Sequence, residues 1–74
     1  MSNGALPPPP AIWRQPDGSP VSCQDKLRVL AENYRELCEV MRDAFEDAVL
    51  IGVDAQEMKQ VIHGIVSALQ SPKA

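Results

Sequence analysis

The residues best suited to chemistry are two cysteines, and Cys23 is the more reactive candidate. It falls in the first turn of a predicted helix, where the helix dipole lowers the pKa of a thiol and increases its thiolate fraction. Such a thiol indicates a redox sensor or a disulfide across a dimer. The carboxylate of Asp25 opposes the thiolate, however, and Cys38 lies where a small core residue is expected. A thiol-dependent redox module using Cys23 is therefore our alternative function.

Neither the single histidine nor the carboxylates have the partners that a metal site or an active site requires. His63 lies on the polar side of a second predicted helix, and the chain has no Cys-x-x-Cys or His-x-x-x-His spacing. Glu36, Asp43 and Asp47 share helical spacing on a solvent-facing side. Because catalysis needs convergent polar groups in a pocket, we expect a protein that is not an enzyme and that uses no metal and no cofactor.

Composition and charge limit the remaining function classes. The 74 residues carry a net charge of −3, whereas nucleic-acid binding depends on clustered Lys and Arg. A nucleic-acid-associated regulator is therefore only the third function, and we expect no nucleic acid as partner. No apolar run is long enough to span a membrane, and no secretory signal opens the chain. Cys23 and Cys38 lie too far apart on one helix to pair, which fits a reducing compartment and a soluble, cytoplasmic protein.

A long helix over about residues 23–51 must position most of these groups. Ser22 can cap its first turn, and neither Gly nor Pro interrupts the stretch. Its apolar residues recur with heptad spacing and form a stripe about three sevenths of the surface wide, which is typical of a helix that faces a core. The stripe includes Leu27, Leu30, Tyr34, Leu37, Cys38, Met41, Phe45 and Ala48.

A shorter helix over about residues 55–70 is expected to fold back on the first. Gly52 can adopt the left-handed conformation that ends helices, and Asp54 can cap the next helix with Glu57 at the capping-box position. Stop and start signals this close predict an antiparallel helical hairpin, so residues 22–71 form one all-α domain. Gly64 is the one misfit in the second helix, and its role stays open.

The N-terminal part of the chain divides into two segments. Residues 1–10 contain the run Pro7 to Pro10 and are expected to form a disordered leader with a short polyproline II spacer. A ligand for a proline-binding domain is the less favoured interpretation of that run. Residues 11–21 combine Trp13 with a tight-turn signal at Pro16-Asp17-Gly18. This extended turn segment is ordered only if Trp13 is anchored, either on its own helices, which we favour, or on a partner.

Two helices of unequal length do not close a core on their own. The short helix covers the long one only partly, which leaves Leu27 and Leu30 bare, and an exposed apolar patch marks an interface. We expect Trp13 to pack near these two residues and two hairpins to pair as a homodimeric four-helix bundle. The sequence thus predicts a small non-catalytic protein–protein interaction module, an assembly, adaptor or regulatory subunit, with an unidentified protein partner possible. Its predicted interface residues are Trp13, Leu27, Leu30, Tyr34, Leu37, Met41, Ile62, Ile65 and Leu69.

Overall fold

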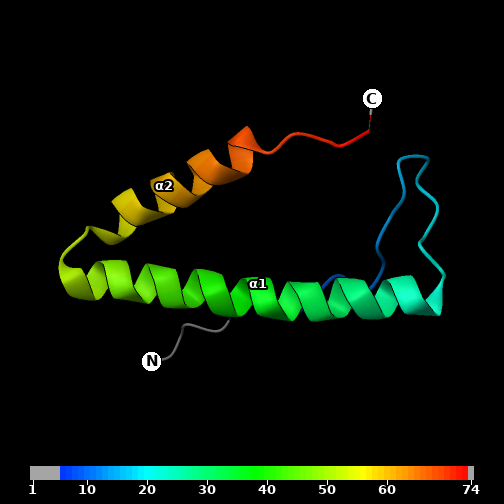
Figure 1. Cartoon of the computed structure of the whole chain (residues 1–74), viewed down its shortest axis with the longest axis horizontal. Helices are drawn as coiled ribbons and strands as arrows, with labels where there is room; N and C mark the ends of the chain where they lie inside the picture. The colour runs from blue at the N-terminus through cyan, green and yellow to red at the C-terminus, as the bar shows by residue number, and fades with distance from the viewer. Residues whose placement is uncertain (1–5, 74) are drawn as a thin grey trace. The chain divides into compact units, whose positions relative to one another are not determined.

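The computed structural model describes residues 6–73 and shows two helices, α1 (Gln24–Ile51) and α2 (Ala55–Ala68) (Figure 1). No β-strand occurs within that range, so the predicted all-α class is confirmed. The chain divides into two compact units between Val40 and Met41, inside α1. Residues 1–5, half of the predicted leader, lie outside the described residues.

In the first unit, α1 begins one residue later than predicted and uses a different cap. The backbone N–H of Leu27 donates to the carbonyl of Cys23 over 2.9 Å, which places Cys23, not Ser22, at the start of the helix. Helix ends shift by a residue or two when neighbouring side chains can each accept from the free N–H groups of the first turn. Asp25 lies in that turn, as the helix dipole favours, and pairs with Arg28 over 3.3 Å.

A hydrogen-bonded turn precedes α1 and confirms the predicted turn at Pro16-Asp17-Gly18. The N–H of Gly18 donates to the carbonyl of Gln15 over 2.8 Å, and Gly18 has a φ of +90°. The N–H of Gln15 donates to Ser19 over 2.8 Å, and that of Val21 donates to Trp13 over 2.7 Å. A tight turn followed by a residue with positive φ joins two antiparallel stretches in this way. In Figure 1 this segment, coloured blue to cyan, forms a loop that leads into the start of α1.

In the second unit, the end of α1 has the geometry predicted from Gly52. Gly52 has a φ of +122°, and its N–H lies 3.1 Å from the carbonyl of Val49. The next N–H, that of Val53, reaches back to the carbonyl of Ala48 over 2.9 Å. These two bonds satisfy carbonyls that the end of a helix leaves without partners, and the positive φ costs glycine little.

Helix α2 begins as predicted but ends two residues early. The side chain of Asp54 accepts from the N–H of Glu57 over 3.0 Å, which confirms Asp54 as the cap. The last helical residue is Ala68 rather than Gln70, because Leu69 is already extended and its N–H turns to the carbonyl of Val66 over 3.2 Å. Pro72 disfavours the helical conformation only at Ser71, so it limits the helix from that side but does not explain the end at Ala68.

No side chain among residues 6–73 is fully buried. The half-buried residues of α1 nevertheless follow the predicted stripe, and in the second unit they accompany half-buried Met58 and Ile62 of α2. The ammonium group of Lys59 lies 6.0 Å from the centre of the Phe45 ring, within the range of a cation–π contact. The two helices therefore form a hairpin with a partly covered apolar stripe. Its half-buried members on α1 are Leu27, Leu30, Tyr34, Cys38, Met41, Phe45 and Ala48.

Candidate interaction surfaces

An aromatic pair ties the N-terminal segment to the first half of α1. The rings of Trp13 and Tyr34 meet edge to face, with centroids 6.4 Å apart and planes inclined by 73°. Both side chains are half-buried. Pairs in this geometry contribute roughly 0.5–1.5 kcal/mol beyond the burial of their area. Trp13 thus packs on its own helix, in the arrangement that we favoured from the sequence.

The hydroxyl of Tyr34 makes a contact that sequence reasoning missed. It donates a hydrogen bond to the carbonyl of Pro7 over 2.5 Å, across 27 positions of the chain. The half-burial of the ring raises the pKa of the Tyr34 hydroxyl, and Cys38 raises it further. The hydroxyl therefore stays protonated and remains a donor over the whole neutral pH range.

The turn that presents Trp13 is held by its own polar side chains. The carboxylate of Asp17 accepts from both the N–H and the hydroxyl of Ser19, over 3.0 and 2.7 Å. The guanidinium of Arg14 donates to the carbonyl of Gly18 over 2.9 Å, and Gln15 donates to the Ser19 hydroxyl over 3.0 Å. The bonds from Ser19 lower the pKa of Asp17, since they favour the charged carboxylate. These local bonds fix the direction from which Trp13 meets α1.

The structure separates the predicted interface residues into two groups. Leu37, Ile65 and Leu69 are exposed, with 56%, 61% and 73% of their surface accessible. The other six are half-buried within the chain itself, so their apolar surface is already partly covered. These six are Trp13, Leu27, Leu30, Tyr34, Met41 and Ile62.

Exposed apolar residues gather along one side of α2 and at Leu69, which directly follows it. Val61 and Val66 are exposed beside Ile65 and Leu69, although our sequence prediction had included only the latter two. We call these four residues the α2 face. Their helical spacing could have identified the whole set, because Val61, Ile65 and Leu69 follow one another at four-residue steps.

A second row of exposed residues lies on α1, beside the half-buried stripe. Val29, Leu37 and Val40 are each at least 49% exposed. The sequence had indicated only Leu37 among them, since Val29 and Val40 fall outside the heptad stripe. We call these three residues the α1 row.

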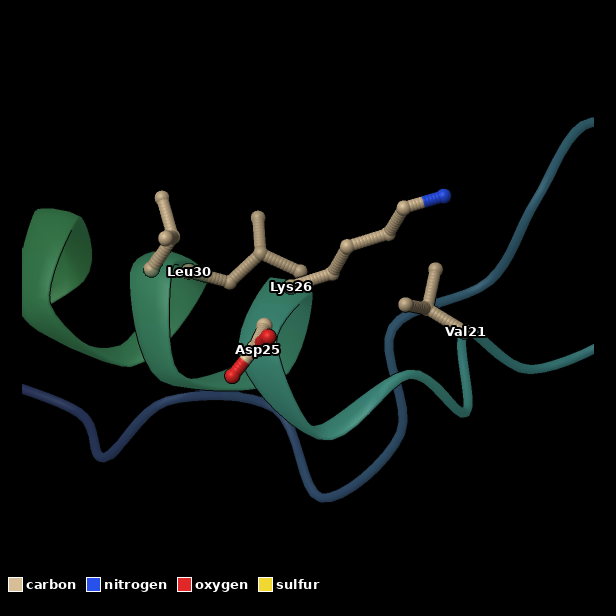
Figure 2. Close-up of a pocket in the computed structure, with 5 residues that line it drawn as sticks. Val21, Asp25, Lys26 and Leu30 are labelled. Atoms are coloured by element: carbon tan, nitrogen blue, oxygen red, sulfur yellow. The ribbon is translucent and has the colours of Figure 1, made fainter.

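One end of the α1 row borders a shallow apolar groove of about 420 Å³. Val21 lines it from the turn segment, and Val29 and Leu30 line it from α1. In Figure 2, Lys26 and Leu30 lie on the same side of α1, whereas the carboxylate of Asp25 points elsewhere. The groove is too open to enclose a small molecule, and its apolar lining suits a side chain of a partner protein.

Cys23 has the surroundings of a moderately activated thiol. It is exposed, and the N–H of Lys26, followed by that of Asp25, lowers its pKa by hydrogen bonding to the sulfur. The charge of Lys26 acts in the same direction. Asp25 therefore assists the thiolate through its backbone, while Arg28 offsets the charge of its carboxylate. Cys38 is a free, half-buried thiol on the stripe of α1.

The remaining candidates for chemistry lie on the surface. His63, Glu36, Asp43 and Asp47 are all exposed. Within residues 6–73, no group of three or more His, Cys, Asp or Glu side chains is placed to hold a metal ion. Neither described helix is long and apolar enough to cross a membrane.

The chain was compared with protein-family models, curated proteins and solved structures. No family model, no curated protein and no solved structure matches the chain.

Proposed function

We propose that this protein is a small non-catalytic interaction module, an assembly, adaptor or regulatory subunit, that self-associates through the apolar residues it leaves exposed. The observation that carries the proposal is the lack of any fully buried side chain among residues 6–73, in a chain that is 45% apolar. Small domains gain the missing stability from a disulfide, a metal or a second subunit. Both cysteines are free, and the exposed α2 face and α1 row favour a second subunit.

The size of the α2 face indicates how strong this pairing would be. Full burial of a Val, Leu or Ile side chain is worth roughly 1.5–3 kcal/mol, so covering a half-exposed one contributes roughly 1 kcal/mol. The α2 face offers four such side chains, and two copies would contribute roughly 8 kcal/mol. Association itself costs about 4–15 kcal/mol. The α2 face alone therefore gives weak pairing, with a dissociation constant on the order of micromolar or weaker. The α1 row is a separate exposed surface in the first unit.

Two matched substitutions test this assignment. Ile65→Glu places a charge in the α2 face, and Leu50→Glu makes the same change at a residue outside the stripe that is 84% exposed. We expect Ile65→Glu to be monomeric, with unchanged helicity, at concentrations where the wild type and Leu50→Glu are dimeric. Sedimentation equilibrium and circular dichroism measure both properties. If Ile65→Glu kept the mass of the wild type, the α2 face would not be the interface.

The lowered pKa of Cys23 favours a thiol-dependent redox module as the second candidate function. An exposed thiolate at the start of a helix is a better nucleophile at neutral pH than an ordinary thiol. The expected result is that Cys23 reacts with iodoacetamide faster than a cysteine of the unfolded chain, with a midpoint below pH 9.0. Peptide mapping separates its rate from that of Cys38. An ordinary rate at Cys23 would remove this candidate.

A further inference from the structure

We propose that Trp13 and Tyr34 form a binding site for an extended proline-rich segment of another protein, and that the chain's own Pro7–Pro10 run is held in its place. The site is separate from the α2 face and does not depend on self-association. Its elements are the hydroxyl of Tyr34, the ring of Trp13 set against it, and the carbonyl that the hydroxyl already binds.

The chemistry of the Tyr34 contact fits a proline ligand. Prolines lack a backbone N–H, so a proline run offers acceptors only, and its carbonyls need a donor from outside the run. The carbonyl of Pro7 belongs to the amide before Pro8, and tertiary amides of this kind are strong acceptors. Tyr34 supplies the donor over 2.5 Å. The same hydroxyl can serve the equivalent carbonyl of any extended proline segment.

The aromatic pair supplies the apolar part of such a site. Proteins that bind proline-rich segments do so in grooves lined by aromatic side chains. The rigid polyproline II conformation favours this binding, because it loses little entropy on docking. Trp13 stands edge to face against Tyr34, with the ring planes inclined by 73°, and the carbonyl of Trp13 accepts a hydrogen bond from the N–H of Val21. The four prolines are themselves exposed, so one polar contact from Tyr34 holds the run at the surface. A contact of this kind exchanges readily with a competing segment.

The covalent link makes the chain's own segment a strong competitor. Only five residues separate Pro7 from Trp13, and short linkers give effective concentrations in the millimolar range. A peptide added to the wild type must compete with that concentration. The site is therefore best examined in the full chain with its own prolines replaced.

The test uses a variant in which Pro7, Pro8, Pro9 and Pro10 are all changed to glycine. The probe is a synthetic peptide of residues 6–12, which lacks Trp, so that emission from Trp13, the only tryptophan, reports on the protein. We expect saturable binding to the glycine variant and at least tenfold weaker apparent binding to the wild type. Adding Tyr34→Phe to the glycine variant keeps the ring but removes the donor, and it should weaken peptide binding several-fold.

Controls make each outcome decisive. A peptide with glycine at the four proline positions should not bind, and all variants should match the wild type in helicity. The proposal is overturned if the glycine variant shows no saturable change up to about 5 mM peptide, well into the range of the effective concentration. It is equally overturned if the glycine peptide binds as well, or if Tyr34→Phe has no effect.

A measurement on the wild type keeps the proposal testable if the glycine variant loses its helices. At a peptide concentration on the order of 10 mM, the indole N–H resonance of Trp13 should shift in the wild type and shift less in Tyr34→Phe. An unchanged resonance in the wild type would overturn the proposal. In Ile65→Glu, which disrupts the α2 face, a Trp13 shift that still depended on protein concentration alone would show that a second copy supplies the segment, and it would overturn the assignment to another protein.

Discussion

Trp13 and Tyr34 stand edge to face, 6.4 Å between ring centroids, and this contact orders the extended segment against the first half of α1. It joins a residue that lies eleven positions before the first residue of α1 to one in the third turn of that helix. The hydroxyl of Tyr34 then extends the contact to Pro7. One tyrosine thus organises both parts of the N-terminal segment, and several expected outcomes depend on it.

Trp13→Ala should lower the free energy of unfolding by about 1–3 kcal/mol, because a half-buried aromatic side chain loses its packing on α1. Ile12→Ala is the matched control. Its side chain is 51% exposed and next to Trp13 in sequence, so the change should stay within about 0.5 kcal/mol. Urea denaturation followed by circular dichroism measures both. Equal effects of the two substitutions would show that Trp13 does not anchor the segment.

The Tyr34 contact should be lost at high pH. The pKa of Tyr34 is raised above its ordinary value of 10.0, so its contribution to stability is fully present below pH 10.0 and disappears as the pH rises through the higher folded value. An ionised phenol has no proton to donate to Pro7. Phenolate absorbance should therefore titrate with a midpoint above 10.0, and Trp13 emission should change in the same step. A midpoint at or below 10.0 would contradict the half-burial of the Tyr34 ring, and Trp13 emission that did not change in that step would contradict the contact with Pro7.

The turn should open in acid. The hydrogen bonds from Ser19 lower the pKa of Asp17 below 3.8, so this stabilisation is present above pH 3.8 and is lost as the pH falls through the lower folded value. The amide resonance of Ser19 should move with that transition. Asp17→Asn, which has no charge to lose, should leave the resonance independent of pH in this range. If the amide resonance of Ser19 did not change with pH in the wild type, the hydrogen bond from Ser19 to Asp17 would be absent.

Two glycine substitutions should have opposite effects on stability. An added Cβ at either Gly52 or Gly64 would meet nothing within 4 Å, so crowding does not distinguish them. Gly52 has a φ of +122°, and alanine there should destabilise by about 1 kcal/mol or more. Gly64 lies inside α2, where alanine should stabilise by about 0.5–1 kcal/mol. Thermal melts of the two variants check both signs. A destabilising Gly64→Ala would indicate that another helix approaches this residue closely.

The sequence predicted the local parts of the structure well, because their causes lie within a few residues. Gly52 ends α1 because it readily adopts a positive φ. Asp54 begins α2 because its side chain can accept a hydrogen bond from the first turn. The turn at Gly18 was predicted for the same reason. The cap of α1 was misplaced by one residue, since Ser22 and Cys23 both carry atoms that can accept from free N–H groups.

The contacts that define the candidate sites were harder to predict, because they depend on distance in space. The sequence of a proline run does not indicate which donor will bind its carbonyls, and Tyr34 lies 27 positions from Pro7. Likewise, heptad spacing identified the stripe of α1 but not which members the chain itself would cover. Leu30 is half-buried while Leu37 stays exposed, although both lie on the predicted stripe.

Sedimentation equilibrium of the wild type across a dilution series tests whether the protein self-associates through its exposed apolar residues. The useful range is about 1 µM to 1 mM, which brackets the weak affinity expected from the α2 face. We predict that the mass rises from the monomer value of 8.1 kDa towards twice that value, with a single concentration-dependent transition. A mass that stays at 8.1 kDa over the whole range, with helicity unchanged, would contradict the proposed function.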